Sequence, residues 1–347
     1  MTKLLFGLSE LNALLSKGGY SKERLFVVAD ANTAGHCLAM ACQQVPRLRQ
    51  AMVLETPAGE EAKTLATAQA LWNTLLRHGA DKRSLLLNLG GGSVSDVGGF
   101  VAACYKRGVR YVNVPTTLLS MADAAIGGKT ALNLGGVKNV VGLVCQPQAV
   151  CLDSVFLPSL PAEELRNGLF EVLKTLMLCD APLYHALRAA MGEGGIPPEE
   201  TLRTMIARCA SFKAAVAHRD PRDRGVRHML NLGHTFGHAM EAYGHLPHGM
   251  AVGVGLACAL YLSERKMGMP QGALHDYMRM LRAQVAMPQY TLRDTEPLLR
   301  LMRQDKKNAD GDIRCVLLQD WETPVINVGI EDNEVRDTLL RVCPCQR

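Results

Sequence analysis

The first half of the chain alternates short aliphatic runs with segments of helical periodicity, and this alternation limits the folds open to it. Four runs have the length and composition of strands, at residues 25–29, 51–54, 84–89 and 110–114. Strands separated by helices in this rhythm form βαβ units, and such units build a parallel sheet. The sequence therefore predicts an N-terminal α/β domain with a parallel sheet.

The pattern changes after about residue 155, where the strand signal fades. Helical spacing follows at residues 161–179, 199–218, 227–243, 248–266 and 271–286, and Pro158 and Pro161 interrupt the chain at the change. We expect two domains, an α/β domain at 1–155 and an all-α domain at 156–347. Because ligands of an open α/β sheet bind beyond the carboxyl ends of its strands, we expect the active site in the cleft between the domains.

Bulk properties exclude several classes of protein. The net charge is +5, but the sequence contains no run of five or more Lys and Arg residues of the kind that binds nucleic acids. The longest apolar stretch, at 250–262, is too short to span a bilayer, and the N-terminus is a poor signal peptide. We expect a cytoplasmic protein that acts on a small molecule, with no membrane or nucleic-acid partner.

A glycine turn follows the third predicted strand. Gly90, Gly91 and Gly92 lead to Asp96, where we expect a helix to begin. Glycines let the backbone approach a pyrophosphate, and a helix N-terminus favours its charge, so the turn suits a Rossmann-like dinucleotide site. A tight strand-to-helix turn that binds no ligand would also contain such glycines.

Polar residues follow two other predicted strands: Asp30, Asn32, Glu60 and Lys63. Each one alone could be a solvated loop residue. As a set they favour a dinucleotide site.

A polar stripe marks the predicted helix at 227–243. One helical face carries Arg227, Asn231, His234, His238 and Glu241. The two histidines have the spacing of zinc proteases, but the glutamate that follows the first histidine in those enzymes is absent. The sequence excludes a protease of that type.

Glu171 lies in a segment too apolar to hold an unpaired carboxylate. Lys174, three residues later, is one possible partner. A metal ion shared with His234 and His248 is the other, because three protein ligands with an open position are typical of catalytic zinc. The residue pattern leaves both open.

A loop with the sequence Gly127-Gly128-Lys129-Thr130 follows Asp123 and suits an anion. The Walker A spacing would need glycine at position 123, so an ATPase is excluded. Further cations occur at Arg107, Lys138, Lys213, Lys306 and Lys307, and each alone could be a solvated surface residue.

Taken together, these motifs resemble the 3-dehydroquinate synthase family, whose members use NAD and zinc. The resemblance runs from Asp30 to Lys307 and rests on segments that occur in the family's order and spacing: 90–96, 105–108, 114–120, 127–130, 138–139, 171–174, 231–239 and 305–307. Two positions depart from the family pattern. Met250 and Asp223 stand where the family often has glutamate, and Met250 removes a possible carboxylate from the surroundings of the metal.

The resemblance implies a complete set of site residues. The metal ligands would be Glu171, His234 and His248, with zinc favoured and cobalt possible. NAD would contact Asp30, Asn32, Glu60, Lys63, Gly90, Gly91, Gly92, Asp96, Thr116, Thr117 and Lys138. The substrate would contact Arg107, Asp123, Lys129, Asn139, Lys174, Lys213, Arg227, Asn231, His238 and Lys306. His238 and Asp223 would transfer protons, with Lys129, Lys174 and Asn231 also catalytic. Family members are usually homodimers, with Arg107 reaching the neighbouring subunit's substrate.

The implied reaction converts 3-deoxy-D-arabino-heptulosonate 7-phosphate to 3-dehydroquinate and phosphate, a step of the shikimate pathway. It would proceed by transient oxidation with NAD, phosphate elimination, reduction and aldol closure. Three alternatives stay open. They are a sister sugar-phosphate cyclase of the 2-deoxy-scyllo-inosose or valiolone synthase type, a zinc polyol dehydrogenase, and a metal-binding scaffold without activity.

Overall fold

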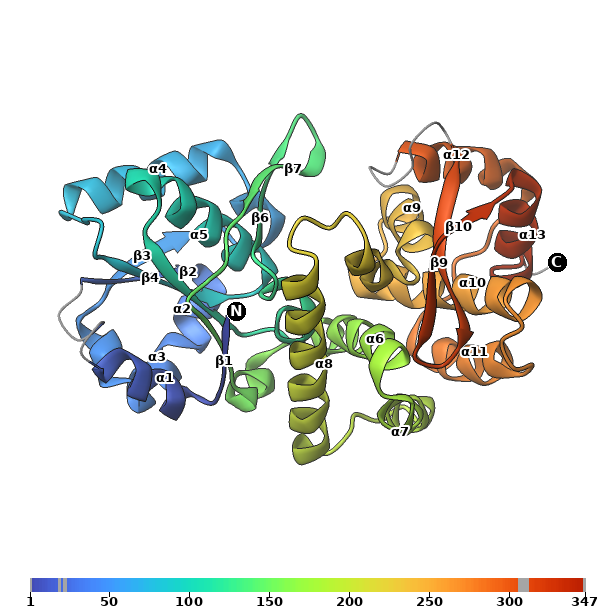
Figure 1. The fold of residues 1–347 in the computed structure, drawn as a ribbon, viewed down its shortest axis with the longest axis horizontal. Coiled ribbons are helices and arrows are strands. Elements are labelled where there is room, and N and C mark those ends of the chain that lie inside the picture. Colours follow the sequence, from blue (N-terminus) through green and yellow to red (C-terminus); the bar gives the residue numbers. More distant parts are fainter. Residues whose placement is uncertain (1, 18–19, 21–23, 305–311, 346–347) are drawn as a thin grey trace. The chain divides into compact units, whose positions relative to one another are not determined.

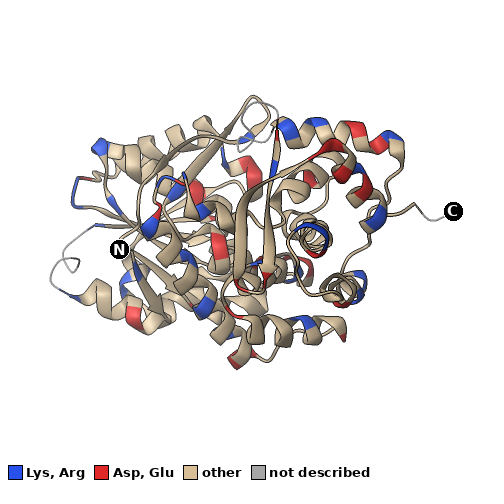
Figure 2. Cartoon of the chain, turned by 45° about the vertical axis from the view of Figure 1, so that its right-hand side comes forward, with Lys and Arg blue, Asp and Glu red and all other residues tan. Residues whose placement is uncertain are grey.

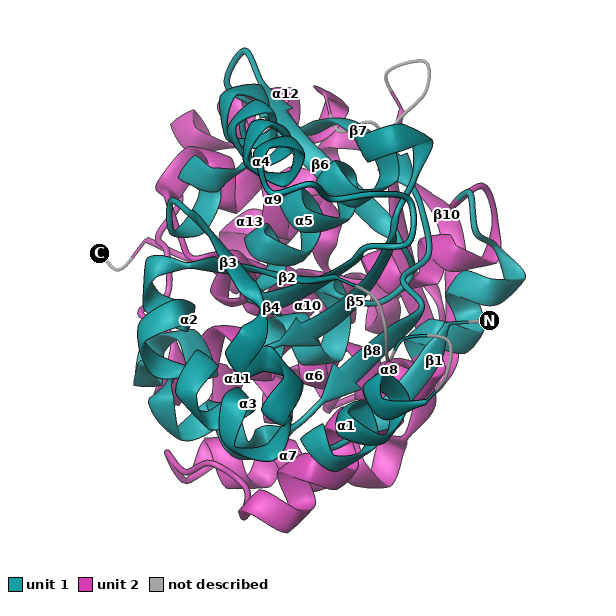
Figure 3. Cartoon of the chain, turned by 90° about the vertical axis from the view of Figure 1, so that its left-hand side faces the viewer, with its two compact units in different colours: residues 1–165, 213–222 teal, residues 166–212, 223–347 magenta. Residues whose placement is uncertain are grey.

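A computed structural model describes residues 2–17, 20, 24–304 and 312–345. The chain forms two compact units (Figure 3). Unit 1 comprises Met1–Leu165 and Lys213–Arg222, and unit 2 comprises Arg166–Phe212 and Asp223–Arg347. Two helices contribute residues to both, α6 (Ala162–Cys179) and α8 (Glu199–Arg219).

Unit 1 is built on a six-stranded parallel sheet (Figure 1), and its strand order is β1-β8-β5-β4-β2-β3 (Figure 3). The strands are β1 (Lys3–Phe6), β2 (Leu25–Asp30), β3 (Met52–Thr56), β4 (Leu85–Gly90), β5 (Arg110–Pro115) and β8 (Ala149–Leu152). Every residue of β2 and β4 is buried, as expected for central parallel strands covered on both faces. The predicted parallel sheet is confirmed. The four-residue strands β1 and β8 were too short to predict.

The helices of unit 1 are α1 (Leu8–Ser16), α2 (Ala31–His36), α3 (Leu38–Gln44), α4 (Leu65–Arg77) and α5 (Gly92–Cys104). Leu71 and Leu75 of α4 and Val97 and Val101 of α5 share a buried cluster with Leu86 of β4. This cluster fixes α5 against the sheet. The helix begins at Gly92 and not at Asp96, so the predicted helix start was four residues late and Asp96 lies inside the helix.

A separate hairpin of unit 1 consists of β6 (Lys129–Leu134) and β7 (Val137–Val144), paired antiparallel. Gly135 and Gly136 form its turn with φ of 60° and 78°, a conformation that glycine adopts without strain. Every residue of β7 is exposed, including Val141 and Leu143. The hairpin was not predicted.

Unit 2 is largely helical, as the sequence predicts. Its helices are α6 (Ala162–Cys179), α7 (Ala181–Gly192), α8, α9 (His234–Gly244), α10 (His248–Lys266), α11 (Ala273–Gln284), α12 (Leu292–Gln304) and α13 (Asp332–Val342). An antiparallel pair, β9 (Ile313–Asp320) and β10 (Thr323–Ile330), is an addition that the helical patterns did not indicate.

The predicted helix at 227–243 is wrong as one continuous element. A 3-10 turn (Val226–Asn231) precedes Gly233, whose φ of 77° breaks the helical path, and α9 starts only at His234. A Cβ at Gly233 would lie 2.9 Å from Leu256. Both the positive φ and the lack of space for a side chain therefore favour glycine at this position. Arg227 and Asn231 therefore lie outside the helix that carries His234.

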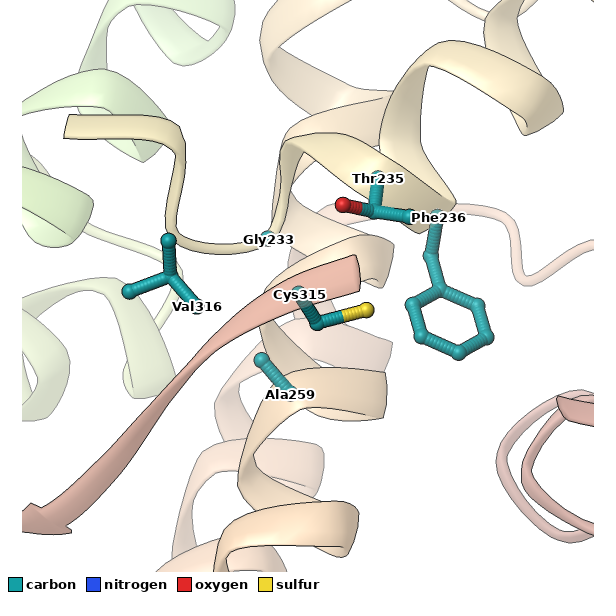
Figure 4. Close-up of a pocket in the computed structure, with 6 residues that line it drawn as sticks. All are labelled: Gly233, Thr235, Phe236, Ala259, Cys315 and Val316. Carbon is teal, nitrogen blue, oxygen red and sulfur yellow. The ribbon is translucent and has the colours of Figure 1, made fainter. Parts of the chain in front are cut away.

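The space beside this break is a packing gap. Gly233, Thr235, Phe236, Ala259, Cys315 and Val316 line it (Figure 4). It has no room for a water molecule, and the Thr235 hydroxyl donates to the Arg314 carbonyl of β9 at 3.1 Å. The gap belongs to the seam between α9, α10 and β9 and does not suit a ligand.

Basic and acidic positions are interspersed over the helices of both units (Figure 2). All eleven cysteines are in the thiol form. Within the described ranges, no helix combines the length and the apolar character needed to cross a membrane.

Candidate active site

Three histidines of unit 2 come together at one place. His234 and His238 lie one turn apart on α9, and His248 is the first residue of α10. One nitrogen of each ring lies within 4.8 Å of the others. The ring centroids of His234 and His238 are 5.0 Å apart, and those of His234 and His248 are 5.6 Å apart. Imidazoles at this spacing suit a transition metal ion.

The carboxylate of Glu171 on α6 lies against two of these rings. Its Oε1 is 3.5 Å from His234 Nε2 and 3.3 Å from His248 Nε2. Its Oε2 is 2.6 Å from Lys174 Nζ, and both side chains are 1% exposed. Lys174 therefore contacts one oxygen of Glu171, and the two histidines with which it would share a metal ion lie against the other.

The outer nitrogens of the two rings show which form of each histidine faces Glu171. His234 Nδ1 lies 3.2 Å from the Leu232 carbonyl oxygen, and His248 Nδ1 lies 2.9 Å from Glu241 Oε2. Since a carbonyl and a carboxylate can only accept, each Nδ1 carries a proton. In the neutral rings, both Nε2 atoms therefore direct lone pairs toward Glu171 Oε1. A cation among these three atoms removes their repulsion, so the residues fit a divalent metal ion.

Proton affinities at the site point the same way. Burial lowers the pKa of His248, but hydrogen bonds to Glu171 and Glu241 outweigh it and raise this pKa to about 9. Burial raises the pKa of Glu171, but Lys174 and His248 outweigh it and hold this pKa below its ordinary range. The group of atoms favours an added positive charge.

In unit 1, predicted cofactor residues gather at the carboxyl ends of β4 and β5. The Thr116 amide donates to the Gly90 carbonyl at 3.0 Å. A Cβ at Gly91 would lie 3.2 Å from the Thr117 methyl group, and one at Gly92 would lie 3.2 Å from Ala124. Small residues thus keep the turn narrow at the N-terminus of α5. Backbone amides at such a helix start suit a phosphate group.

A polar network connects this helix to the β6–β7 hairpin. Lys63, 3% exposed, places Nζ 2.7 Å from Asp96 Oδ2 and also donates to Asn139 Oδ1. Burial raises the pKa of Asp96, and Lys63 opposes that rise. Glu60 accepts from Asn133 Nδ2 at 2.9 Å. Residues that the resemblance assigned to the cofactor and to the substrate therefore meet in one network.

Asp30 caps a helix. Its Oδ1 accepts from the Thr33 amide at 2.8 Å, and the Thr33 hydroxyl accepts from the Asp30 amide at 3.0 Å. The carboxylate is buried, so it is not the solvated loop residue that was its alternative. Asn32, on the first turn of α2, is exposed.

The predicted anion loop is held from two sides within unit 1. Lys213 Nζ lies 2.5 Å from Asp123 Oδ1 and 2.7 Å from the Asp123 carbonyl oxygen. Buried Asn113 of β5 donates to the Ala125 carbonyl at 2.9 Å. Lys129, the first residue of β6, is exposed. These contacts hold the loop in place within unit 1.

The other predicted residues differ in burial. Arg227 is 3% exposed, and Asn231 and Asp223 are half-buried. Asp223 has a left-handed φ of 56°, and its carbonyl lies 2.9 Å from His228 Nε2. Arg107 and Lys138 are exposed. Lys306 lies outside the described residues.

Sequence reasoning missed several polar residues that support the site. Glu241 appeared in the polar stripe without a role, and Asn113 and Asn133 were not considered. Asn167 lies one turn before Glu171 on α6, and its Oδ1 accepts from the Gly249 amide at 2.5 Å. A polar residue four positions from Glu171 in an apolar helix was the available signal.

Comparison with known proteins decides the family. The profile for the N-terminal part of 3-dehydroquinate synthase matches residues 53–167, and the profile for its C-terminal part matches 168–308. The chain belongs to the 3-dehydroquinate synthase family. A family member named 3-dehydroquinate synthase from Parabacteroides distasonis is 33% identical, with 95% of this chain and 94% of that protein covered. Another, from Pseudomonas aeruginosa, is 42% identical, with 82% and 78% covered.

A solved structure shares the fold over nearly the whole chain. It is a 2-deoxy-scyllo-inosose synthase complexed with carbaglucose-6-phosphate, NAD+ and Co2+. The TM-score is 0.84 at 24% identity, and 97% of this chain and 95% of that chain are covered. At this identity the likeness establishes the fold and not the substrate.

Proposed function

We propose that the protein is a 3-dehydroquinate synthase that converts 3-deoxy-D-arabino-heptulosonate 7-phosphate to 3-dehydroquinate and phosphate. Family membership over most of the chain supports this activity. The observation that carries it in the structure is the meeting of Glu171 Oε1 with the Nε2 atoms of His234 and His248. Such a cation site suits a reaction in which a substrate hydroxyl must lose its proton.

The metal ligands in this proposal are Glu171, His234 and His248, with zinc or cobalt as the ion. When bound, the metal would acidify a substrate hydroxyl, and NAD would accept and return a hydride, leaving no net oxidation. His238 lies beside His234 and is the candidate for moving a substrate proton, with Asp223 as a second. Lys174 would hold Glu171 ionised and offer a cation to a developing oxyanion.

NAD would be held by the residues at the ends of the parallel strands. The narrow turn at Gly90, Gly91 and Gly92 suits the pyrophosphate, and Thr116 and Thr117 border it. The resemblance adds Asp30, Asn32, Glu60, Lys63, Asp96 and Lys138. Of these, buried Lys63 and half-buried Asp96 already form an ion pair that fixes the local geometry.

The substrate carries a carboxylate and a phosphate, so its site needs several cations. Lys129, Lys213, Arg227 and Arg107 would supply them, with Asp123, Asn139 and Asn231 as polar partners and a lysine of the pair 306–307 as a further contact. A polyol dehydrogenase has no need for these cations, which disfavours that alternative. A sister cyclase acting on a substrate without a carboxylate would need fewer.

We also propose that the protein is a homodimer, as its family resemblance implies. The exposed apolar residues of the β6–β7 hairpin support the proposal: Leu134, Val137, Val140, Val141, Leu143 and Val144. Lys106 and Arg107 hold left-handed φ of 47° and 66°, a strained conformation that often marks a functional loop. Light scattering checks the mass, since a monomer of 37.7 kDa at assay concentration would contradict the dimer.

One assay tests the function. The protein is incubated with the heptulosonate phosphate, Zn2+ and an amount of NAD smaller than the amount of substrate. The concentrations of free phosphate and of NADH are followed together. We expect phosphate release far beyond the NAD added, no net NADH, and 3-dehydroquinate by NMR. Net NADH would identify a dehydrogenase. No release from this substrate, but release from glucose 6-phosphate, would identify a sister cyclase.

A further inference from the structure

We propose that Glu241 is a positioning residue for the metal site, which orients His248 and supplies negative charge that the Glu171–Lys174 pair lacks. The inference rests on the proposed metal-binding function. Glu241 is not among the residues that the family resemblance assigns to metal, cofactor or substrate.

The contact is direct. Glu241 lies seven residues after His234 on α9, so the two side chains share one face of the helix. Glu241 Oε2 lies 2.9 Å from His248 Nδ1, while His248 Nε2 lies 3.3 Å from Glu171 Oε1. The imidazole thus bridges two carboxylates, one on each nitrogen. A carboxylate on the far nitrogen fixes the tautomer and orientation of a ligating histidine and raises its basicity.

The backbone of His248 leaves the ring angle to be set by a partner. The Gly249 amide is fixed by Asn167, and a Cβ at Gly249 would stand 1.9 Å from the Asn167 carbonyl oxygen. The backbone at this point is thus held closely against α6, and rotation about the side-chain bonds of His248 remains. The ring is one-third exposed, so packing alone does not hold it. The hydrogen bond to Glu241 does.

Charge gives Glu241 a second role. Glu171 and Lys174 form a 2.6 Å pair, and together they carry no net charge. The pair therefore offers a divalent ion less attraction than an isolated carboxylate would. Glu241, whose side chain is 18% exposed, places a second carboxylate one imidazole away.

The test measures metal affinity and not only turnover. Zn2+ and Co2+ dissociation constants are determined with a competing chelator for the metal-free wild type, Glu241→Ala, Glu241→Gln and Glu193→Ala. Glu193 is an exposed glutamate of unit 2, so its loss makes the same charge change away from the site. Thermal melts of the metal-free proteins check the fold. The visible spectrum of the Co2+ forms reports the coordination geometry.

We expect Glu241→Ala to weaken binding of both ions about 10–100-fold, as loss of such a partner typically does. Glu241→Gln should lose less, because its amide oxygen can still accept from His248 Nδ1, and Glu193→Ala should match the wild type. The Co2+ spectrum should change in Glu241→Ala. At saturating metal, kcat of this variant should return to within a few-fold of wild type.

Three results would overturn the inference. The first is equal metal affinity in Glu241→Ala and Glu193→Ala. This result would not contradict the proposed synthase activity, provided that the wild type releases phosphate from the substrate. The second is a kcat that stays lost at saturating metal, because Glu241 would then act in the chemistry itself. The third is a wild-type protein that binds neither ion, which overturns the proposed metal site as well. Should Glu241→Ala fail to fold, the near-isosteric Glu241→Gln decides on the same affinity criterion.

Discussion

Replacing Lys174 with methionine tests whether the buried charges of the metal site need one another. Lys174 and Glu171 are each 1% exposed and 2.6 Å apart. Removing one partner of a buried pair leaves an uncompensated charge and typically costs about 3–5 kcal/mol. For a unit of this size, each kcal/mol lowers the melting temperature by about 2–4 °C, so Lys174→Met should melt about 6–20 °C below wild type.

The chain offers a matched control. Lys266 and Glu334 in the same unit are also 2.6 Å apart, but each side chain is 29% exposed. A partly exposed pair of this kind contributes at most about 1 kcal/mol, because water screens its charges. Lys266→Met should therefore lower the melting temperature by no more than about 4 °C. The two variants remove the same chemical group at the same distance and differ in burial.

Zinc should then separate a metal site from a purely structural ion pair. An ion present at 100 times its dissociation constant stabilises a protein by about 2.7 kcal/mol. In Lys174→Met the metal supplies the cation that Glu171 has lost, so Zn2+ should raise the melting temperature of this variant more than that of wild type. The assay is differential scanning calorimetry with and without Zn2+. The reasoning would be refuted if Lys174→Met and Lys266→Met lowered the melting temperature equally. It would also be refuted if Zn2+ did not reduce the difference in melting temperature between Lys174→Met and wild type.

Four further substitutions test other parts of the site. Gly249→Ala should lower the free energy of unfolding in urea by about 1–3 kcal/mol or more, because its Cβ would stand 1.9 Å from a backbone oxygen. In the control Gly244→Ala the added Cβ meets no atom within 4 Å, so this variant should unfold like wild type. Lys63→Met removes the cation beside the half-buried Asp96 carboxylate. It should weaken NAD binding, measured by calorimetry, about tenfold or more, roughly 1.4 kcal/mol; unchanged binding would exclude this pair from the cofactor site. Glu171→Gln should abolish tight Zn2+ binding, whereas His238→Ala should bind Zn2+ and lose turnover; the reverse pattern would make His238 the ligand.

The sequence predicted the elements that carry strong periodicity. The four predicted strands are β2 to β5, and the predicted helix at 248–266 is α10 with the same bounds. Each of these has a continuous apolar pattern of its own. The strands β1 and β8 have four residues each, and a run this short is not distinguishable from a loop until its neighbours pair with it.

The break at Gly233 shows why the polar stripe was misread. Arg227, Asn231, His234 and His238 have helical spacing in the sequence, and an isolated glycine is compatible with a helix. Only the contact with Leu256, which comes from another helix, reveals that Gly233 must leave the helical path. The histidines still lie on one face of α9. Family resemblance, and not periodicity, linked them to residues of distant segments.

Contacts between helices explain what remained hidden in the apolar stretch at 250–262. Its glycines looked like interruptions of a hydrophobic helix. In the structure a Cβ at Gly255 would stand 2.0 Å from the Gly233 carbonyl oxygen, and one at Gly253 would stand 2.5 Å from the Phe170 ring. α10 therefore packs at backbone distance on the start of α9 and close against α6. These are the helices that carry His234 and Glu171.

Close packing between α6, α9 and α10 can by itself hold the metal ligands near one another. Asn167 on α6 fixes the Gly249 amide of α10, and the glycine contacts fix α10 against α9. The ordering cost of binding is then limited to side-chain rotation, which the contact of Glu241 with His248 reduces further. It follows that removal of the metal should leave the helical content of unit 2 intact, and that affinity for the ion should respond most to changes in the few side chains that still rotate.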